Sequence, residues 1–245
     1  MPVPSAAQLL DVWERALSES PTRRALSLLA AAHPEISEDE LAALPIGRRD
    51  ARLLRLREHL FGPQLMLVVP CPQCGQHLES QIGIRDIGCD PDQPATGTYT
   101  AESHGYRVTF RLPASDDLMA LPQGSAVAHA SEFLIGRCVL EVRDAHGEAR
   151  PVPTLPENVV ADITRHMERA DPGADIELAF ECPSCSHQWR EVFDIVSFLW
   201  REIHAWAQRT LRDVHVLARA YGWREPDVLS LSPTRRQIYL ELCRP

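Results

Sequence analysis

The sequence predicts an α+β fold in which two short β-hairpins are separated by a long insertion and flanked by helices. Two strand-like apolar runs each end in Cys-Pro-x-Cys, and apolar residues recur with helical spacing at both ends of the chain. Between the two cysteine motifs, strand-like and helix-like patterns are mixed. We therefore divide the 245 residues into five segments. They are 1–62 (helical), 63–88 (first hairpin), 89–173 (α/β insertion), 174–196 (second hairpin) and 197–245 (helical).

Helix-start signals recur through residues 1–62. Ser5-Ala-Ala-Gln8 and Ser37-Glu-Asp-Glu40 are capping boxes, and Ser20-Pro21 is an N-cap followed by a proline at the first helical position. A fourth helix is expected near residues 48–61. We interpret its arginines as a solvated helix face; they are Arg48, Arg49, Arg52, Arg55 and Arg57.

The insertion begins with a predicted hairpin, with strands at 97–103 and 106–112 joined by His104-Gly105. A short helix is expected at 116–121, and a helix merging into a strand at 126–140. The sequence predicts a further helix over 157–170, which Thr154 and Glu157 would cap.

The C-terminal segment is expected to be helical throughout. Apolar residues keep helical spacing for about 27 residues from Ile195, and Gly222 is placed to end that helix. A short helical turn is expected at 227–231, and Ser232-Pro233 marks the start of a last helix.

The two cysteine motifs belong to an internal repeat. Cys71-Pro-Gln-Cys74 and Cys182-Pro-Ser-Cys185 align without gaps, and each has an apolar run before it and a strand with outward polar residues after it. A Cys-x-x-Cys turn places two thiolates on one side of a tight knuckle, and two knuckles together make the tetrahedral four-sulfur site that zinc accepts. The sequence therefore predicts one structural Zn²⁺ bound by Cys71, Cys74, Cys182 and Cys185 in a zinc ribbon split by the insertion.

Other interpretations of the cysteines remain open. Two local disulfides are disfavoured in a cytosolic chain, and a thioredoxin-like redox motif lacks the βαβ pattern that should surround it. The knuckles could also be relics that hold no metal. His77 and His187 follow the knuckles and could replace a thiolate, although surface histidines are the simpler interpretation.

No catalytic residues emerge from the sequence. Serine, histidine and acidic residues form no nucleophile elbow, P-loop or His-Glu-x-x-His motif. Four thiolates would also fill the coordination sphere of zinc and leave no position for a reactive water. We therefore expect a protein that is not an enzyme and has no small-molecule substrate. A zinc hydrolase would need an open metal position.

Charge divides the chain unevenly. The net charge is −9 and every basic residue is arginine, which argues against a protein that binds nucleic acid mainly through phosphates. Residues 197–245 nevertheless carry +3, whereas residues 1–196 carry −12. We expect a partner-binding surface in this positive segment, formed by Trp223, Arg235, Arg236 and Tyr239. The alternative is that Trp223 and Tyr239 only pack the last helix onto the long one.

No apolar run approaches the roughly 20 residues that span a bilayer, and the N-terminus has no secretory-signal pattern. The sequence thus predicts a soluble, cytoplasmic protein without a membrane partner.

The C-terminal segment resembles a known family, the T-even phage baseplate protein known as the baseplate hub assembly chaperone. That family ends with a helix, a Tyr-x-Trp break, an acid-hydrophobic-Leu turn, and Arg-Arg before a Tyr. The resembling stretches are Phe198-Leu-Trp-Arg-Glu202-Ile203, His215-Val-Leu-Ala218-Arg-Ala-Tyr221-Gly-Trp223, Asp227-Val-Leu-Ser-Leu231 and Arg235-Arg236-Gln-Ile-Tyr239-Leu240. The resemblance covers about the last 50 residues. The cysteine hairpins and N-terminal helices lie outside it and look like an elaboration.

The resemblance implies a structural or chaperone-like role at the baseplate of a phage tail or phage-like contractile injection system. Its partners would be other baseplate or hub and spike proteins. The protein would act in the cytoplasm during assembly and could stay in the particle. The main alternative is a zinc-ribbon protein that binds nucleic acid or assists transcription.

Overall fold

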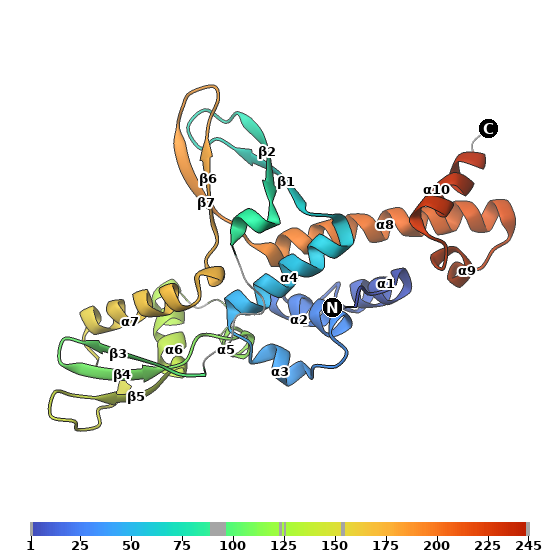
Figure 1. Cartoon of the computed structure of the whole chain (residues 1–245). Coiled ribbons are helices and arrows are strands. Elements are labelled where there is room, and N and C mark those ends of the chain that lie inside the picture. Colours follow the sequence, from blue (N-terminus) through green and yellow to red (C-terminus); the bar gives the residue numbers. More distant parts are fainter. Residues whose placement is uncertain (1, 89–96, 123, 125, 153–154, 244–245) are drawn as a thin grey trace. The chain divides into compact units, whose positions relative to one another are not determined.

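The computed structural model describes residues 2–88, 97–122, 124, 126–152 and 155–243. The chain forms two compact units: residues 1–36 together with 195–245, and residues 37–194. The first unit is helical, and the second holds both hairpins and the insertion (Figure 1). None of the helices in the described part of the chain combines the length and the apolar character that a membrane span requires.

The helical unit begins with α1 (Ala6–Arg15) and α2 (Pro21–Ala32). The Ser5–Gln8 capping box is present, and the hydroxyl of Ser20 accepts from the backbone N–H of Arg23, so both predicted helix starts are confirmed. Both helices pack on the long helix α8 (Ile195–Tyr221). The guanidinium of Arg24 on α2 lies 4.5 Å from the ring centroid of Trp200 on α8.

Helix α8 ends where the sequence predicts. Gly222 adopts a φ of 68°, which lets the chain turn into α9 (Glu225–Leu229) and then α10 (Pro233–Leu242). A small core of Val214 and Leu217 from α8 and Val228 from α9 joins these two helices, and Leu240 of α10 packs against it. Trp223 and Tyr239 pack against that core.

The second unit begins with α3 (Glu38–Ala42), started by the predicted Ser37–Glu40 capping box, and α4 (Ile46–Phe61). The expectation of a solvated arginine face on α4 is wrong for three of its members, since Arg48, Arg49 and Arg57 are buried. The side chain of Arg49 donates to Asp50 at 2.7 Å and to the hydroxyl of Ser115 at 3.3 Å. Hydrogen bonds to side chains and to backbone oxygens replace water around such arginines.

Glycine allows α4 to approach the end of the insertion closely. The N–H of Gly47 donates to the buried carboxylate of Asp171 at 2.8 Å. A Cβ at position 47 would lie 2.1 Å from Oδ1 of that carboxylate and 2.7 Å from the backbone N of Ala174. Only glycine therefore fits at this contact between α4 and the 3₁₀ turn η3 (Pro172–Ala174).

Both predicted hairpins are present as two-stranded antiparallel sheets. The first pairs β1 (Gln64–Pro70) with β2 (His77–Gly83), and the second pairs β6 (Glu177–Glu181) with β7 (Gln188–Val192). The last pairs before the two turns are Pro70 with His77 and Glu181 with Gln188, which are equivalent positions of the repeat. The two hairpins therefore pair their strands at equivalent positions of the sequence repeat.

The insertion is a three-stranded antiparallel sheet covered by helices. Its strands follow the order β3 (Tyr99–Ser103), β4 (Tyr106–Phe110) and β5 (Val139–Arg143). The helices are α5 (Ser115–Met119), α6 (Val127–Cys138) and α7 (Glu157–Ala170), and the short turn η1 (Ile84–Ile87) follows the first hairpin. The strands and the three helices agree with the sequence predictions, whereas the sequence did not predict η1. The N-cap of α7 is Pro156 without a side-chain cap, and Thr154 lies outside the described residues.

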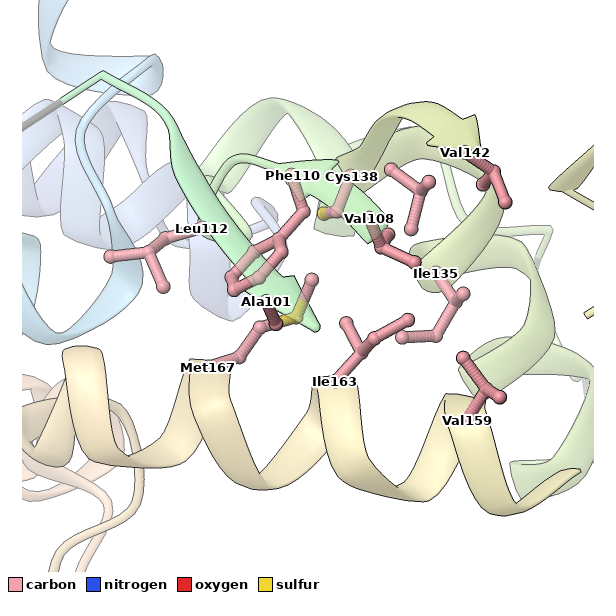
Figure 2. Packing of buried hydrophobic residues seen from close by; sticks show 11 residues of the cluster. Ala101, Val108, Phe110, Leu112, Ile135, Cys138, Val142, Val159, Ile163 and Met167 are labelled. Atoms are coloured by element: carbon pink, nitrogen blue, oxygen red, sulfur yellow. The ribbon is translucent and has the colours of Figure 1, made fainter. Parts of the chain in front are cut away.

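The core of the insertion lies between the sheet and α7 (Figure 2). Val159, Ile163 and Met167 project from one face of α7 towards Ala101, Val108 and Phe110 of the sheet. The spacing of four residues between them places all three on one stripe of the helix. This core joins the sheet to α7, and both elements lie between the two hairpins in the sequence.

Candidate metal centre

The turns of the two hairpins bring four cysteines together. The Sγ atoms of Cys71, Cys74, Cys182 and Cys185 all lie within 4.8 Å of one another. The shortest distances run between the hairpins, 3.7 Å from Cys71 to Cys185 and 3.5 Å from Cys74 to Cys182. The two pairs are equivalent in the repeat, because each joins the first cysteine of one motif to the second cysteine of the other. The predicted ligand set is therefore assembled by residues from both halves of the repeat.

The spacing of the sulfur atoms fits a tetrahedral metal. With zinc–sulfur bonds of about 2.3 Å, two ligands of a regular tetrahedron lie about 3.8 Å apart. The cross-hairpin distances are close to this value, and the thiolate-only donor set suits zinc or an iron–sulfur centre rather than a hard cation. The four cysteines can hold a metal ion.

Each knuckle is shaped by the same backbone hydrogen bonds. In the first, the N–H of Cys71 donates to the carbonyl of Gln76, and the N–H of Gly75 donates back to the carbonyl of Cys71. In the second, the N–H of Cys182 donates to His187 and that of Ser186 donates to Cys182. Such a closed turn keeps both of its sulfur atoms on one side.

The two knuckles differ at the residue after the second cysteine. This residue has a positive φ in both, 74° at Gly75 and 54° at Ser186. Glycine adopts this conformation freely, whereas an L side chain at such a φ costs about 1 kcal/mol. The second knuckle therefore holds a strained serine where the first has glycine.

The thiols of Cys182 and Cys185 differ in their pKa. Burial alone would raise the pKa of Cys182, but hydrogen bonds from the backbone N–H groups of Ser184 and Cys185 and from neighbouring thiols lower this pKa to about 7. A backbone hydrogen bond at His187 lowers the pKa of Cys185, yet burial and the neighbouring sulfur atoms outweigh it and raise this pKa to about 12. Cys182 therefore ionises more readily than Cys185, and a bound dication would favour the ionised form of both thiols.

Histidine does not take part in the cluster. The ring of His187 stacks on that of Trp189 with the centroids 5.9 Å apart, and His77 is exposed. Of the other cysteines, Cys138 is buried near Asp117 and Cys243 ends α10. Cys89 lies outside the described residues.

The residues predicted to bind a partner form a packed cluster with one exposed member. The rings of Trp223 and Tyr239 meet edge to face at 4.9 Å, and both stack or pack on Tyr221. Arg236 is buried, with its guanidinium 3.5 Å from the carbonyl oxygen of Leu231, in contrast to the expected exposure. Arg235 is exposed. The alternative that the aromatic rings fasten α10 to α8 describes these contacts, and partner binding by this segment stays a prediction.

Sequence reasoning missed a buried ion-pair network in the insertion. The carboxylate of Asp117 is completely buried and accepts two hydrogen bonds from Arg111, at 2.6 and 2.8 Å, and one from Nε of Arg137 at 2.7 Å. The N–H of Ala114 donates a fourth at 3.0 Å. Arg137 is 20 residues from Asp117 in the sequence, and the three charged residues follow no motif. Only the closely spaced Arg111 and Asp117, beside a short apolar strand, offered a signal.

Comparison with known families is informative over most of the chain. The profile of a family described as the T4 bacteriophage base plate protein matches residues 24–200. This segment contains 177 of the 245 residues. Neither the curated proteins nor the solved structures contain a match to the chain.

The matched segment differs from the stretch that suggested this family in the sequence. That stretch, residues 197–245, shares only residues 197–200 with the match. Both cysteine hairpins and the whole insertion, which were expected to be an elaboration outside the family resemblance, lie inside it. The description of the matched family does not mention an assembly chaperone, so the match does not support that part of the resemblance. Because the profile covers more than two thirds of the sequence, this chain belongs to the family of the T4 bacteriophage base plate protein.

Proposed function

We propose that this chain is a structural component of the baseplate of a phage tail or a phage-like contractile injection system, with a chaperone-like role in assembly. The observation that carries the proposal is the family match over residues 24–200, which includes the hairpins and the insertion. A family of baseplate proteins favours work through protein contacts rather than catalysis. The partners would be other baseplate or hub and spike proteins.

The cysteine cluster fits a clasp made by one Zn²⁺. Four thiolates close the coordination sphere, so the ion would supply cross-linking and no reactive water. Residues 75–181 lie between the two knuckles, and a shared ion would join the ends of this segment. Metal binding would then be coupled to the folding of both hairpins.

The positively charged segment 197–245 is the proposed contact surface for a partner. Arg235 is exposed and available for a bidentate contact with a carboxylate. Trp223 and Tyr239 hold α10 in place, so their contribution to binding is to orient Arg235. Assembly would take place in the cytoplasm of the producing cell, and a structural role predicts that the protein stays in the particle.

A complementation experiment tests the proposal. The gene is deleted from a strain that produces the particle, and plasmid-borne variants are scored by electron microscopy for tails with a complete baseplate. The wild-type gene should restore complete particles. Cys71→Ser combined with Cys182→Ser should not, because it removes one ligand from each hairpin.

The matched control is Gln73→Ala combined with Ser184→Ala. Both residues are exposed within the knuckles and neither is a ligand. Complete particles in normal numbers in the deletion strain would overturn the structural role. Complete particles with the double serine variant would instead remove only the metal clasp from the proposal.

A further inference from the structure

An open apolar groove lies on the insertion between α6, α7 and the segment that leads into α5. It has a volume of about 380 Å³. Its apolar lining includes Leu112, Leu134, Ile135 and Met167. Three of these also belong to the core of the insertion, as Figure 2 shows for Leu112, Ile135 and Met167. The floor of the groove is therefore fixed by the packing of the sheet against α7.

The rim of this groove is acidic. Glu168 on α7 and Asp175 after η3 both line it, and both are exposed. Neither has an ion-pair partner among the residues that the structure describes. The third rim acid, Asp171, is buried and bound to the N–H of Gly47. An apolar groove with two free carboxylates suits an apolar helix face that ends in a basic residue.

Helix α10 presents such a face. Ile238 and Leu242 are 51% and 69% exposed, and their spacing of four residues puts them on one side of the helix. Arg235 lies on the same side, seven residues before Leu242, and is also exposed. Arg236 and Tyr239 lie on the adjacent side of the helix, with Tyr239 one turn from Arg235, and pack within the helical unit. The exposed face of α10 is thus separate from the face that holds the helix in its own unit.

We propose that α10 of one copy of this chain binds in the acidic groove of a second copy. Ile238 and Leu242 would contact the lining formed by Leu134 and its neighbours, and Arg235 would face Glu168 and Asp175. The charge of the chain supports a second copy as the occupant, because the helix lies in a segment of +3 and the groove in a segment of −12. The proposal depends neither on the metal nor on any other baseplate protein.

The contact would be heterologous, since the helix and the groove are different surfaces. Every copy keeps a free helix and a free groove after the first contact, so the association continues until it closes into a ring or extends as a chain. Helix α10 has 10 residues and is about 15 Å long, so a single contact is small and weak. Self-association should therefore appear at high protein concentration and be steep once rings can close.

The test measures molecular mass by sedimentation equilibrium over a range of concentrations up to about 1 mM, a range chosen for an interface of the small class. The wild-type chain should form assemblies larger than a dimer. Leu242→Asp should remove them, because it places a charge in the apolar contact. Leu134→Asp should do the same from the groove side. Controls are Gln237→Asp on α10 and His129→Asp on α6, which add the same charge at exposed positions away from the contact stripe of each helix.

Mixing the two disrupted variants gives the sharpest result. Leu242→Asp keeps an intact groove and Leu134→Asp keeps an intact α10, so an equimolar mixture has one intact interface and should stop at a heterodimer. Should Leu134→Asp fail to fold, as judged by circular dichroism, Glu168→Arg replaces it. Glu168→Arg alone should weaken association about fivefold, and Arg235→Glu in the same chain should restore it.

A wild-type chain that stays monomeric over the whole range overturns the proposal. So does a mixture of the two disrupted variants that never forms a dimer, or a symmetric dimer that Leu242→Asp and Glu168→Arg leave unchanged.

Discussion

The indole Nε1 of Trp13 on α1 donates a hydrogen bond to Nδ1 of His204 on α8, across 191 positions of sequence, at 3.1 Å. The two rings also lie with their centroids 5.7 Å apart. The indole N–H can only donate, so Nδ1 of His204 is the acceptor of this bond. His204 therefore ties the last turn of α1 to α8.

Replacing the indole by a phenyl ring measures this bond. Trp13→Phe keeps an aromatic ring and removes the donor, and we expect a loss of about 1 kcal/mol in the free energy of unfolding. His204→Phe should cost a similar amount. Urea denaturation of both single variants and the double variant gives the coupling energy, which should be about 1 kcal/mol. Additive losses would mean that the bond contributes nothing.

The four cysteines should behave as one site. Cys71→Ser and Cys182→Ser each remove one buried ligand from the same coordination sphere, so both should lower the thermal midpoint by the same amount. Metal analysis of the purified wild-type chain should give about one zinc per chain, as expected for a four-thiolate site. A large effect of only one of the two substitutions would show that the hairpins do not share an ion.

The positive φ at the two knuckles predicts an asymmetry. Gly75→Ser should lower the stability of the metal-bound protein by about 1 kcal/mol, since the side chain meets no neighbour and only the backbone is strained. Ser186→Gly should not lower it, because relief of strain offsets the greater freedom of glycine in the unfolded chain. Thermal denaturation of both variants checks this. Equal losses would contradict the strain at Ser186.

Asp117 predicts a specific response to acid. Burial would raise its pKa, but hydrogen bonds from Arg111, the N–H of Ala114 and Arg137 lower it to about 2, from an ordinary value of 3.8. A depressed folded-state pKa contributes stability above the unfolded value and loses it as the pH falls, so about 2 kcal/mol should disappear between about pH 4 and pH 2. Urea denaturation across this range should show the loss in the wild-type chain.

Asp117→Asn should abolish that dependence and cost about 3 kcal/mol at neutral pH, because it leaves two arginines without their shared carboxylate. Asp116→Asn is the control, since Asp116 is exposed on the same helix. The same acid sensitivity in both substituted chains would assign the effect to other carboxylates.

The close approach at Gly47 predicts a large effect from one methyl group. Gly47→Ala places a Cβ into Asp171 and the backbone of Ala174, so the start of α4 and η3 must move apart. We expect a loss of at least about 2 kcal/mol, although alanine is the better helix former by about 1 kcal/mol. Gly136→Ala on α6, where the space is open, should instead be stabilising. A neutral Gly47→Ala in urea denaturation would contradict the packing.

Features set by near neighbours in sequence were predicted well. The capping boxes at Ser5 and Ser37, the proline-started helices and the end of α8 at Gly222 depend on side chains within one turn of the backbone they bond. The cysteine hairpins were also predictable, because spacing and repeat together define a knuckle.

Features set by distant packing were not predictable. The periodicity of α4 places its arginines around an apolar stripe but does not say which of them lie against neighbouring elements. The pattern therefore predicts a surface position for Arg49, which is buried. Arg236 is the same case on α10. The acidic groove also joins residues from separate helices, and no motif connects Leu134 with Glu168.

Along the sequence, the parts of this protein are nested. The insertion lies between the two hairpins, and the hairpins lie between residues 1–36 and 195–245 of the helical unit. The pair of hairpins and the helical unit each need two separate segments of the chain. During synthesis the insertion can therefore fold first, the four cysteines can come together only after Cys185 emerges, and α8, α9 and α10 form last. The helical unit therefore stays incomplete during translation. Helices α1 and α2 are made early but cannot pack on α8 until most of the chain has been synthesised.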